Sequence, residues 1–389
     1  ALAAQARFVA EKLFPRHPKK YIWMTLLGER VGAELTDPRA PDVLSNHLPG
    51  PGLTIARSSW DADAVWTSFQ AGPKIAVDHQ HNDQGHFELW RGSDALLVDG
   101  GGPFAFATIN HNTLLIDDGG RVLNYPPNQG VWARASRTVA FGDDGRAVVA
   151  VGDLGDAWAP KCALAGCSER AVTSAVRTMV YVRPATLVID DRVEVDRDDV
   201  GVTWAAHVAT NPTLGPGLAS AVIGGSRVDV RTLLPAGVAA TAPKEPTVKE
   251  SHVYKKNDPR GDMWRLEVAS VVGSRARSFL HWITADAAGQ APAAATAISG
   301  TGLRGGIGVR GGETVAVLFS ETSAGGTAVV GTGAEVIVIA GLTPGESYAV
   351  SARGGDGGCA VSIAPGAGLT ATSGGFVRVA APGCTLKAN

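Results

Sequence analysis

The sequence predicts an all-β protein, built as a large antiparallel β-sandwich (a super-sandwich) with a smaller C-terminal β unit and a short helical N-terminal segment. Three observations support this fold class. From about Leu53 onward, apolar and polar residues alternate with period two in short runs. Turn sequences such as Asp118-Gly119-Gly120 separate the runs, and no pattern of helical length interrupts them. Many short strands without intervening helices are typical of a sandwich.

The N-terminal segment differs from the rest of the chain. Residues 1–14 are predicted to form a helix, because their apolar side chains recur at helical spacing, and Pro15 and Pro18 end it. A proline-rich stretch follows. This helical content is too small to close a core by itself. We therefore expect residues 1–50 to be the tail of a helical domain and a linker.

The β part of the chain divides at a zone rich in Gly and Ala near residues 287–312. On this basis we expect residues 51–298 to form the large β-sandwich and residues 299–389 to form the small C-terminal β domain. No fixed-period repeat of the solenoid type is visible.

Charge and hydropathy exclude some classes of partner. The formal net charge is −2, so no global field attracts nucleic acid or an anionic membrane. The sequence has no apolar stretch of about 20 residues, the length that a transmembrane helix needs. An anionic substrate would have to be met by a local cluster of Arg and Lys.

The four cysteines allow three pairings, of which the simplest is local: Cys162 with Cys167, and Cys359 with Cys384. Neither pair has the spacing of a zinc knuckle or a redox motif. We favour disulfides, which implies an oxidising compartment, so that the protein would be secreted or periplasmic. The alternative is a cytoplasmic protein with four buried thiols.

Histidines gather in one segment, because four of the nine lie within residues 79–111. On a strand, His79, His81 and Asp83 project to one face. Asp99 ends an apolar run eighteen residues after His81, and His111 follows twelve residues later. Histidine and carboxylate ligands at strand ends suit a zinc site. The alternative is that carbonyl groups and water satisfy these histidines, and that Asp99 caps the glycine turn that follows it.

These motifs, in this order, resemble the β-sandwich pattern of the heparinase II/III-like polysaccharide lyases and their alginate- and chondroitin-type relatives. The resemblance covers roughly residues 50–210. It includes a strand pair that contains Arg177 and Asp191. The matching motifs are His79-Gln80-His81-Asn82-Asp83, Leu96-Leu97-Val98-Asp99-Gly100 and His111-Asn112-Thr113.

The resemblance implies a lyase that cleaves a uronate-containing acidic polysaccharide or oligosaccharide by β-elimination. It implies a Zn²⁺ ion with a structural role, held by His81, Asp99 and His111. It also implies that His79 faces substrate as a catalytic or carboxylate-contacting residue, and that Asp83 orients an imidazole.

The sequence departs from the family pattern in two ways. In these lyases an α/α-toroid precedes the sandwich and supplies a catalytic tyrosine, so we expect an N-terminal α/α-toroid domain or chain as a partner. Some relatives carry another tyrosine between the metal-binding aspartate and the HNT motif, but the interval from Gly100 to Asn110 has none. Tyr125 is the candidate to replace it. Arg134 and Arg137 are candidate partners of the substrate carboxylate, and the alternative is that both are solvated.

Three functions compete at this stage. The first is a polysaccharide lyase, of which this chain is the C-terminal β-sandwich part. The second is a non-catalytic, zinc-stabilised module for glycan binding or assembly, which the missing toroid favours. The third is a zinc hydrolase, which would need an exchangeable metal-bound water beside His79.

Overall fold

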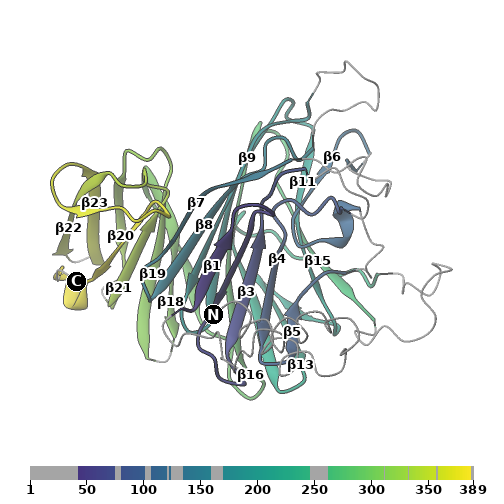
Figure 1. The fold of residues 1–389 in the computed structure, drawn as a ribbon, viewed down its shortest axis with the longest axis horizontal. Helices are drawn as coiled ribbons and strands as arrows, with labels where there is room; N and C mark the ends of the chain where they lie inside the picture. The colour runs from purple at the N-terminus through teal and green to yellow at the C-terminus, as the bar shows by residue number, and fades with distance from the viewer. Residues whose placement is uncertain are drawn as a thin grey trace, which may run out of the picture. The chain divides into compact units, whose positions relative to one another are not determined.

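The computed structural model places the described part of the chain in β-structure (Figure 1). Ser45–Asn389 form one compact unit. Residues 1–42, and with them the expected N-terminal helix, lie outside the described residues. Within the described residues, no helix is long and apolar enough to cross a bilayer. The described residues are 43–74, 80–100, 107–120, 122–123, 135–158, 170–245, 262–310, 312–331, 333–355 and 358–386.

Two sheets carry the segments that contain the histidine motifs. The first is antiparallel and has the strand order β1-β2-β3-β4-β5. Its strands are β1 (Ser45–Leu48), β2 (Leu53–Arg57), β3 (Val65–Gln70), β4 (Phe87–Arg91) and β5 (Asp94–Leu97). The second has the order β15-β11-β6. It consists of β6 (Leu114–Asp117), preceded by the 3₁₀ turn η2 (Thr108–Asn110), β11 (Gly201–Val208) and β15 (Trp264–Ala269).

An eight-stranded antiparallel sheet follows, in the order β12-β13-β14-β16-β10-β9-β8-β7. Most residues at its centre are buried on both faces, which explains the continuous apolar runs in this part of the sequence. Its strands are β7 (Arg137–Asp143), β8 (Ala147–Asp153), β9 (Val172–Val182), β10 (Thr186–Val195), β12 (Thr213–Gly215), β13 (Leu218–Ile223), β14 (Ser226–Leu234) and β16 (Ala276–Ala287).

The C-terminal strands form a nine-stranded sheet in the order β24-β22-β23-β20-β17-β18-β19-β21-β25. The pair β19 and β21 is parallel, and the other pairs are antiparallel. The 3₁₀ turn η4 (Pro382–Cys384) follows the last strand. The strands are β17 (Ala295–Thr301), β18 (Leu303–Arg310), β19 (Glu313–Ser320), β20 (Gly326–Val330), β21 (Val336–Ala340), β22 (Ser347–Gly355), β23 (Gly358–Pro365), β24 (Leu369–Thr370) and β25 (Phe376–Ala380).

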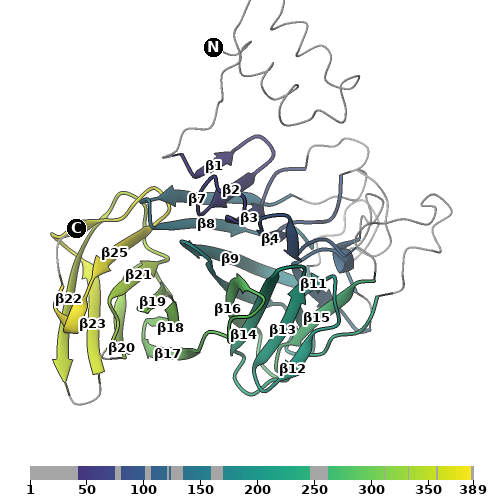
Figure 2. The same ribbon diagram turned by 90° about the horizontal axis from the view of Figure 1, so that it is seen from below.

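The eight-stranded sheet has a hydrophobic core on each face. On one face, Met179 and Phe279 pack in the same cluster as Phe87 of β4 and Trp204 of β11. On the other face, residues such as Trp282 pack with the nine-stranded sheet, whose strands lie beside it in Figure 2. The nine-stranded sheet encloses a further core of its own. The predicted all-β sandwich with a C-terminal β unit is thus confirmed.

The zone near residues 287–312 is more than a divider, because it contains the whole of β17 and β18. Its glycines permit close packing. A Cβ atom on Gly305 would lie 2.0 Å from the carbonyl oxygen of Val317, and one on Gly308 would lie 2.7 Å from the Trp282 ring. Gly305 and Gly308 therefore serve as packing positions within a strand.

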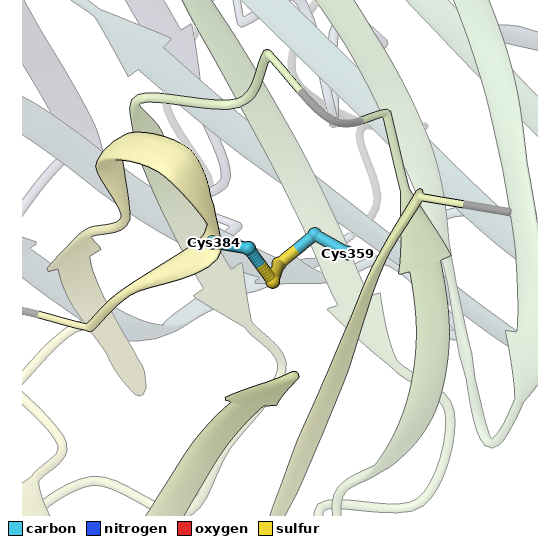
Figure 3. The surroundings of a disulfide bond; sticks show 2 residues. All are labelled: Cys359 and Cys384. Carbon is cyan, nitrogen blue, oxygen red and sulfur yellow. A yellow bond between two sulfur atoms is a disulfide. The ribbon is translucent and has the colours of Figure 1, made fainter. Parts of the chain in front are cut away.

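One of the two expected disulfides is confirmed. Cys359 on β23 and Cys384 in η4 form a disulfide that ties the chain end to the nine-stranded sheet (Figure 3). The other expected pair, Cys162 and Cys167, lies outside the described residues.

Candidate metal centre

The structure brings His81, Asp99 and His111 together. One potential ligand atom from each residue lies within 4.8 Å of the other two. The positions follow from the strands. Val98, which pairs with His207 in an isolated bridge, continues β5 to Asp99, and His111 directly follows η2. This convergence supports the predicted ligand set, and the binding of a metal by these residues stays a prediction.

The contacts within this group fit a metal centre. The Nδ1 atom of His111 lies 2.7 Å from Oδ1 of Asp99, and the rings of His81 and His111 are 5.1 Å apart. Within the described structure, Nε2 of His111 is buried and has no hydrogen-bond partner. An unpaired buried ring nitrogen beside a carboxylate and a second imidazole is a donor set that zinc accepts.

A second group of potential ligands shares Asp99 and adds His86 and Glu88. The Nε2 atom of His86 lies 3.3 Å from Oδ1 of Asp99 and 3.7 Å from Oε1 of Glu88. The other ring nitrogen, Nδ1, accepts a hydrogen bond of 3.0 Å from the backbone N–H of Asn112. Burial lowers the pKa of His86, but the charges of Asp99 and Glu88 outweigh this effect, and the net shift is upward.

Asn112 connects the elements around the centre. Its backbone N–H reaches His86, and its Nδ2 donates to the carbonyl oxygen of Phe87 over 2.8 Å. Its Oδ1 accepts from the backbone N–H and from Nδ1 of His207, over 2.8 and 2.9 Å. The residue is fully buried. One side chain thus links β4, β11 and the segment that carries His111.

His207 is a fully buried histidine whose ring contacts the residues around the centre. Its Nδ1 faces Oδ1 of Asn112, while its Nε2 lies 3.1 Å from the Ile109 carbonyl and 3.4 Å from Oε1 of Glu245. Both ring nitrogens of His207 therefore have polar partners. A Cβ atom on Gly100 would lie 2.2 Å from Cδ2 of His207, so glycine at this position allows the close approach.

Arg177 and Asp191 form a fully buried bidentate ion pair below the centre. Nε and Nη2 of Arg177 bond the two oxygens of Asp191 over 2.7 and 3.0 Å. Its Nη1 donates to the carbonyl oxygens of Gly85 and Asn112, over 2.6 and 3.0 Å. Two backbone segments of the centre are therefore fixed to β9 and β10 by one guanidinium group.

These charges keep Asp99 ionised. Burial raises the pKa of the Asp99 carboxyl, but His86, His111 and His207 together hold it well below its usual range. An ionised carboxylate among imidazoles is the state that metal coordination requires.

The three expected catalytic residues, His79, Tyr125 and Arg134, lie outside the described residues, so their roles stay predictions. Asp83 lies near the centre, where its backbone carbonyl accepts from the N–H of His86 over 2.9 Å, and its expected role in orienting an imidazole also stays a prediction. Arg137 pairs with Asp153 over 2.8 Å, and its side chain is 74% exposed. This contact agrees with the alternative of a solvated arginine.

Sequence reasoning assigned no role to several residues of the centre. His86 is one of the four histidines that gather within residues 79–111, and Asn112 is the middle residue of the HNT motif. His207 carried a weaker signal, a histidine inside the apolar strand β11. Glu245 had no local signal, because its place beside His207 depends on the pairing of distant segments.

Comparisons with known proteins agree with this architecture. The family described as "Heparinase II/III-like, C-terminal" matches residues 41–330. No curated protein matches the chain. Among solved structures, the heparan sulfate lyase HepC from Pedobacter heparinus is similar over 81% of this chain, with 15% identity and a TM-score of 0.57. A heparinase III is similar over 82% of this chain, with 17% identity and a TM-score of 0.55.

The matches cover 48% of the HepC chain and 47% of the heparinase III chain. The chain thus corresponds to about half the length of these solved lyases. At this level of identity, the structural likeness establishes the fold.

Proposed function

We propose that this chain, which belongs to the heparinase II/III-like C-terminal domain family, is the β-sandwich part of a polysaccharide lyase that cleaves a uronate-containing acidic glycan by β-elimination. The observation that carries the proposal is the convergence of His81, Asp99 and His111 at the strand ends, within a fold shared with solved heparin lyases. His79, two residues before His81 in the sequence, would then lie beside this centre.

Zinc is a metal that two imidazoles and one carboxylate can hold. A zinc ion bound by His81, Asp99 and His111 would cross-link the segments that carry these residues. It would thereby fix the backbone next to His79. Elemental analysis of the purified protein should find about one zinc per chain. His81→Ala should lose the metal and lower the melting temperature, because metal binding is coupled to folding. Protein prepared without chelators that contains no transition metal would refute the zinc site.

The elimination needs three protein groups. A base takes the proton from C5 of the uronate, the electrons of that bond form the C4–C5 double bond, and an acid protonates the departing C4 oxygen. A cation or hydrogen-bond donors must also neutralise the C6 carboxylate. We assign His79 to the base or to the carboxylate contact, Tyr125 to proton transfer, and Arg134 to the carboxylate.

Two further expectations accompany this proposal. The disulfide between Cys359 and Cys384 supports an oxidising compartment, and hence a secreted or periplasmic protein. The partner that completes the site is an N-terminal α/α-toroid domain or chain. The length of the solved lyases, about twice the matched region, supports a second domain of this size.

The test is a product assay on the natural gene product that contains this chain. Heparan sulfate, chondroitin, hyaluronan and alginate serve as uronate substrates, and dextran is the control without a uronate. A lyase creates an unsaturated uronate, which is detected by its ultraviolet absorbance and by a product mass that lacks one water relative to hydrolysis. Products of hydrolytic mass would instead favour the zinc hydrolase.

The second candidate is a zinc-stabilised glycan-binding module without catalysis. The observation that favours it is the absence of tyrosine between Gly100 and Asn110. Calorimetric binding of a uronate oligosaccharide, together with no unsaturated product from the natural gene product, would establish this function instead.

A further inference from the structure

We infer that His86 is a positioning residue for Asp99 and is not itself a metal ligand. The inference rests on the proposed zinc centre and deepens it, because the structure offers two overlapping ligand groups that share Asp99. The hydrogen-bond partners of the two imidazoles, His86 and His111, distinguish these groups.

The position of the hydrogen on His86 is fixed by its surroundings. The backbone N–H of Asn112 can only donate, and it points at Nδ1 of His86 over 3.0 Å in a buried setting. Nδ1 therefore presents its lone pair, and the hydrogen of the neutral ring is on Nε2. The Nε2 atom that carries this hydrogen lies 3.3 Å from Oδ1 of Asp99 and 3.7 Å from Oε1 of Glu88.

A zinc ligand needs the opposite arrangement. Coordination through Nε2 of His86 would require its lone pair there and the hydrogen on Nδ1. The hydrogen on Nδ1 would then face the N–H of Asn112, and a buried hydrogen bond would become a contact between two donors. His111 has no such conflict, because within the described structure its Nε2 has no hydrogen-bond partner.

The remaining contacts show what His86 does. Nε1 of Trp90 donates to Oε2 of Glu88 over 3.1 Å, so the Glu88 carboxylate is held with its other oxygen toward His86. Asn112 holds the ring from the opposite side. The fixed N–H of His86 therefore restrains the Asp99 carboxylate, and this restraint preorganises it for the ion. Partners of this kind contribute about 10- to 100-fold to metal affinity.

Two variants separate the two ring nitrogens of His86. His86→Asn keeps an acceptor near Nδ1 but has no group that reaches the place of Nε2. His86→Gln places an amide N–H near Nε2 and loses the acceptor for Asn112. His47→Asn is the matched control, since His47 bonds Thr54 in another part of the five-stranded sheet.

Zinc affinity is measured by competition with a chromophoric chelator, and the ligand set is read from the visible spectrum of the Co²⁺-substituted protein. We expect His86→Asn to bind zinc about 10- to 100-fold more weakly, while His86→Gln stays within a few-fold of the unmodified protein. The cobalt spectrum at saturation should be unchanged in both variants, since neither change removes a ligand.

Other outcomes overturn the inference. An altered cobalt spectrum in both variants would make His86 a ligand. Zinc affinity in His86→Asn equal to that of His47→Asn would remove the positioning role, while the zinc centre itself would stand. A natural protein that binds neither zinc nor cobalt would overturn the metal centre and this inference together.

Discussion

The buried imidazole of His281 gives the protein a defined sensitivity to acid. Its ring stacks on Trp204 with 3.9 Å between ring centres, and Nδ1 lies 3.4 Å from Oγ1 of Thr232. Nε2 is buried and has no partner within the described structure. Burial, with a smaller contribution from the charge of Arg177, lowers the pKa of His281 to about 3. The folded protein thus keeps this ring neutral.

The sign and size of the effect follow from linkage. Unfolded, the ring has a pKa of about 6.5, so below that pH the unfolded state binds a proton that the folded state refuses. The stabilisation is fully present above about pH 6.5 and is lost as the pH falls toward 3. At about pH 5, roughly 1.5 units below the ordinary pKa, the free energy of unfolding should be lower by about 2 kcal/mol, at about 1.4 kcal/mol per unit.

Urea unfolding at about pH 7 and about pH 5 measures this loss in the natural protein and in His281→Phe, which keeps an aromatic ring on Trp204. The variant should lose about 2 kcal/mol less than the natural protein over this interval. Titration of carboxylates and release of metal affect both proteins and cancel in the comparison. His47→Phe is the control, because His47 is partly exposed and should show a smaller effect. An equal loss in the natural protein and His281→Phe would refute the reasoning.

Three further predictions concern other parts of the molecule. His79→Ala in the natural gene product should lower lyase activity by about 100-fold or more and leave zinc content unchanged; lost zinc would make His79 a ligand, and full activity would remove its catalytic role. Arg177→Met should destabilise the fold by about 3–5 kcal/mol in urea unfolding, because it leaves Asp191 buried without its partner. Adding Asp191→Leu should recover much of this loss. An Arg177→Met variant as stable as the natural protein would contradict this prediction. Replacing Cys359 and Cys384 by Ala should cost about 3.5 kcal/mol, the value for a loop of 25 residues. An unchanged melting temperature would show that the bond adds no stability.

The period-two pattern was enough to predict the central strands. Three of the short alternating runs that begin near Leu53 form β2, β3 and β4. These strands each bury one face, so their sequence alternates. The strand β18 could not be predicted from this pattern, because its glycines give no alternation of apolar and polar residues. Close contacts with Val317 and Trp282 nevertheless leave room only for glycine at two of these positions.

The candidate ligands could be predicted because they lie in three short motifs next to apolar strands. Their surroundings could not. The ring of His207 contacts Asn112 and Glu245 only because β11 pairs with β6 and β15. Local sequence patterns do not predict the pairing of strands so far apart in the chain. The choice between His86 and His111 as a ligand depends on which nitrogen meets a backbone N–H, and this is a property of three-dimensional structure alone.

The eight-stranded sheet has a hydrophobic core on each face, and the C-terminal strands cover one of these faces. The C-terminal strands are therefore a required part of the fold. A chain shortened before β17 would expose the side chains of Val149, Val180, Leu280 and Trp282 to water as one continuous apolar face. Such a face invites aggregation. Substitutions on either side of this layer must therefore remain compatible with each other, so the sandwich and the C-terminal sheet are expected to be inherited, exchanged and engineered as a single piece.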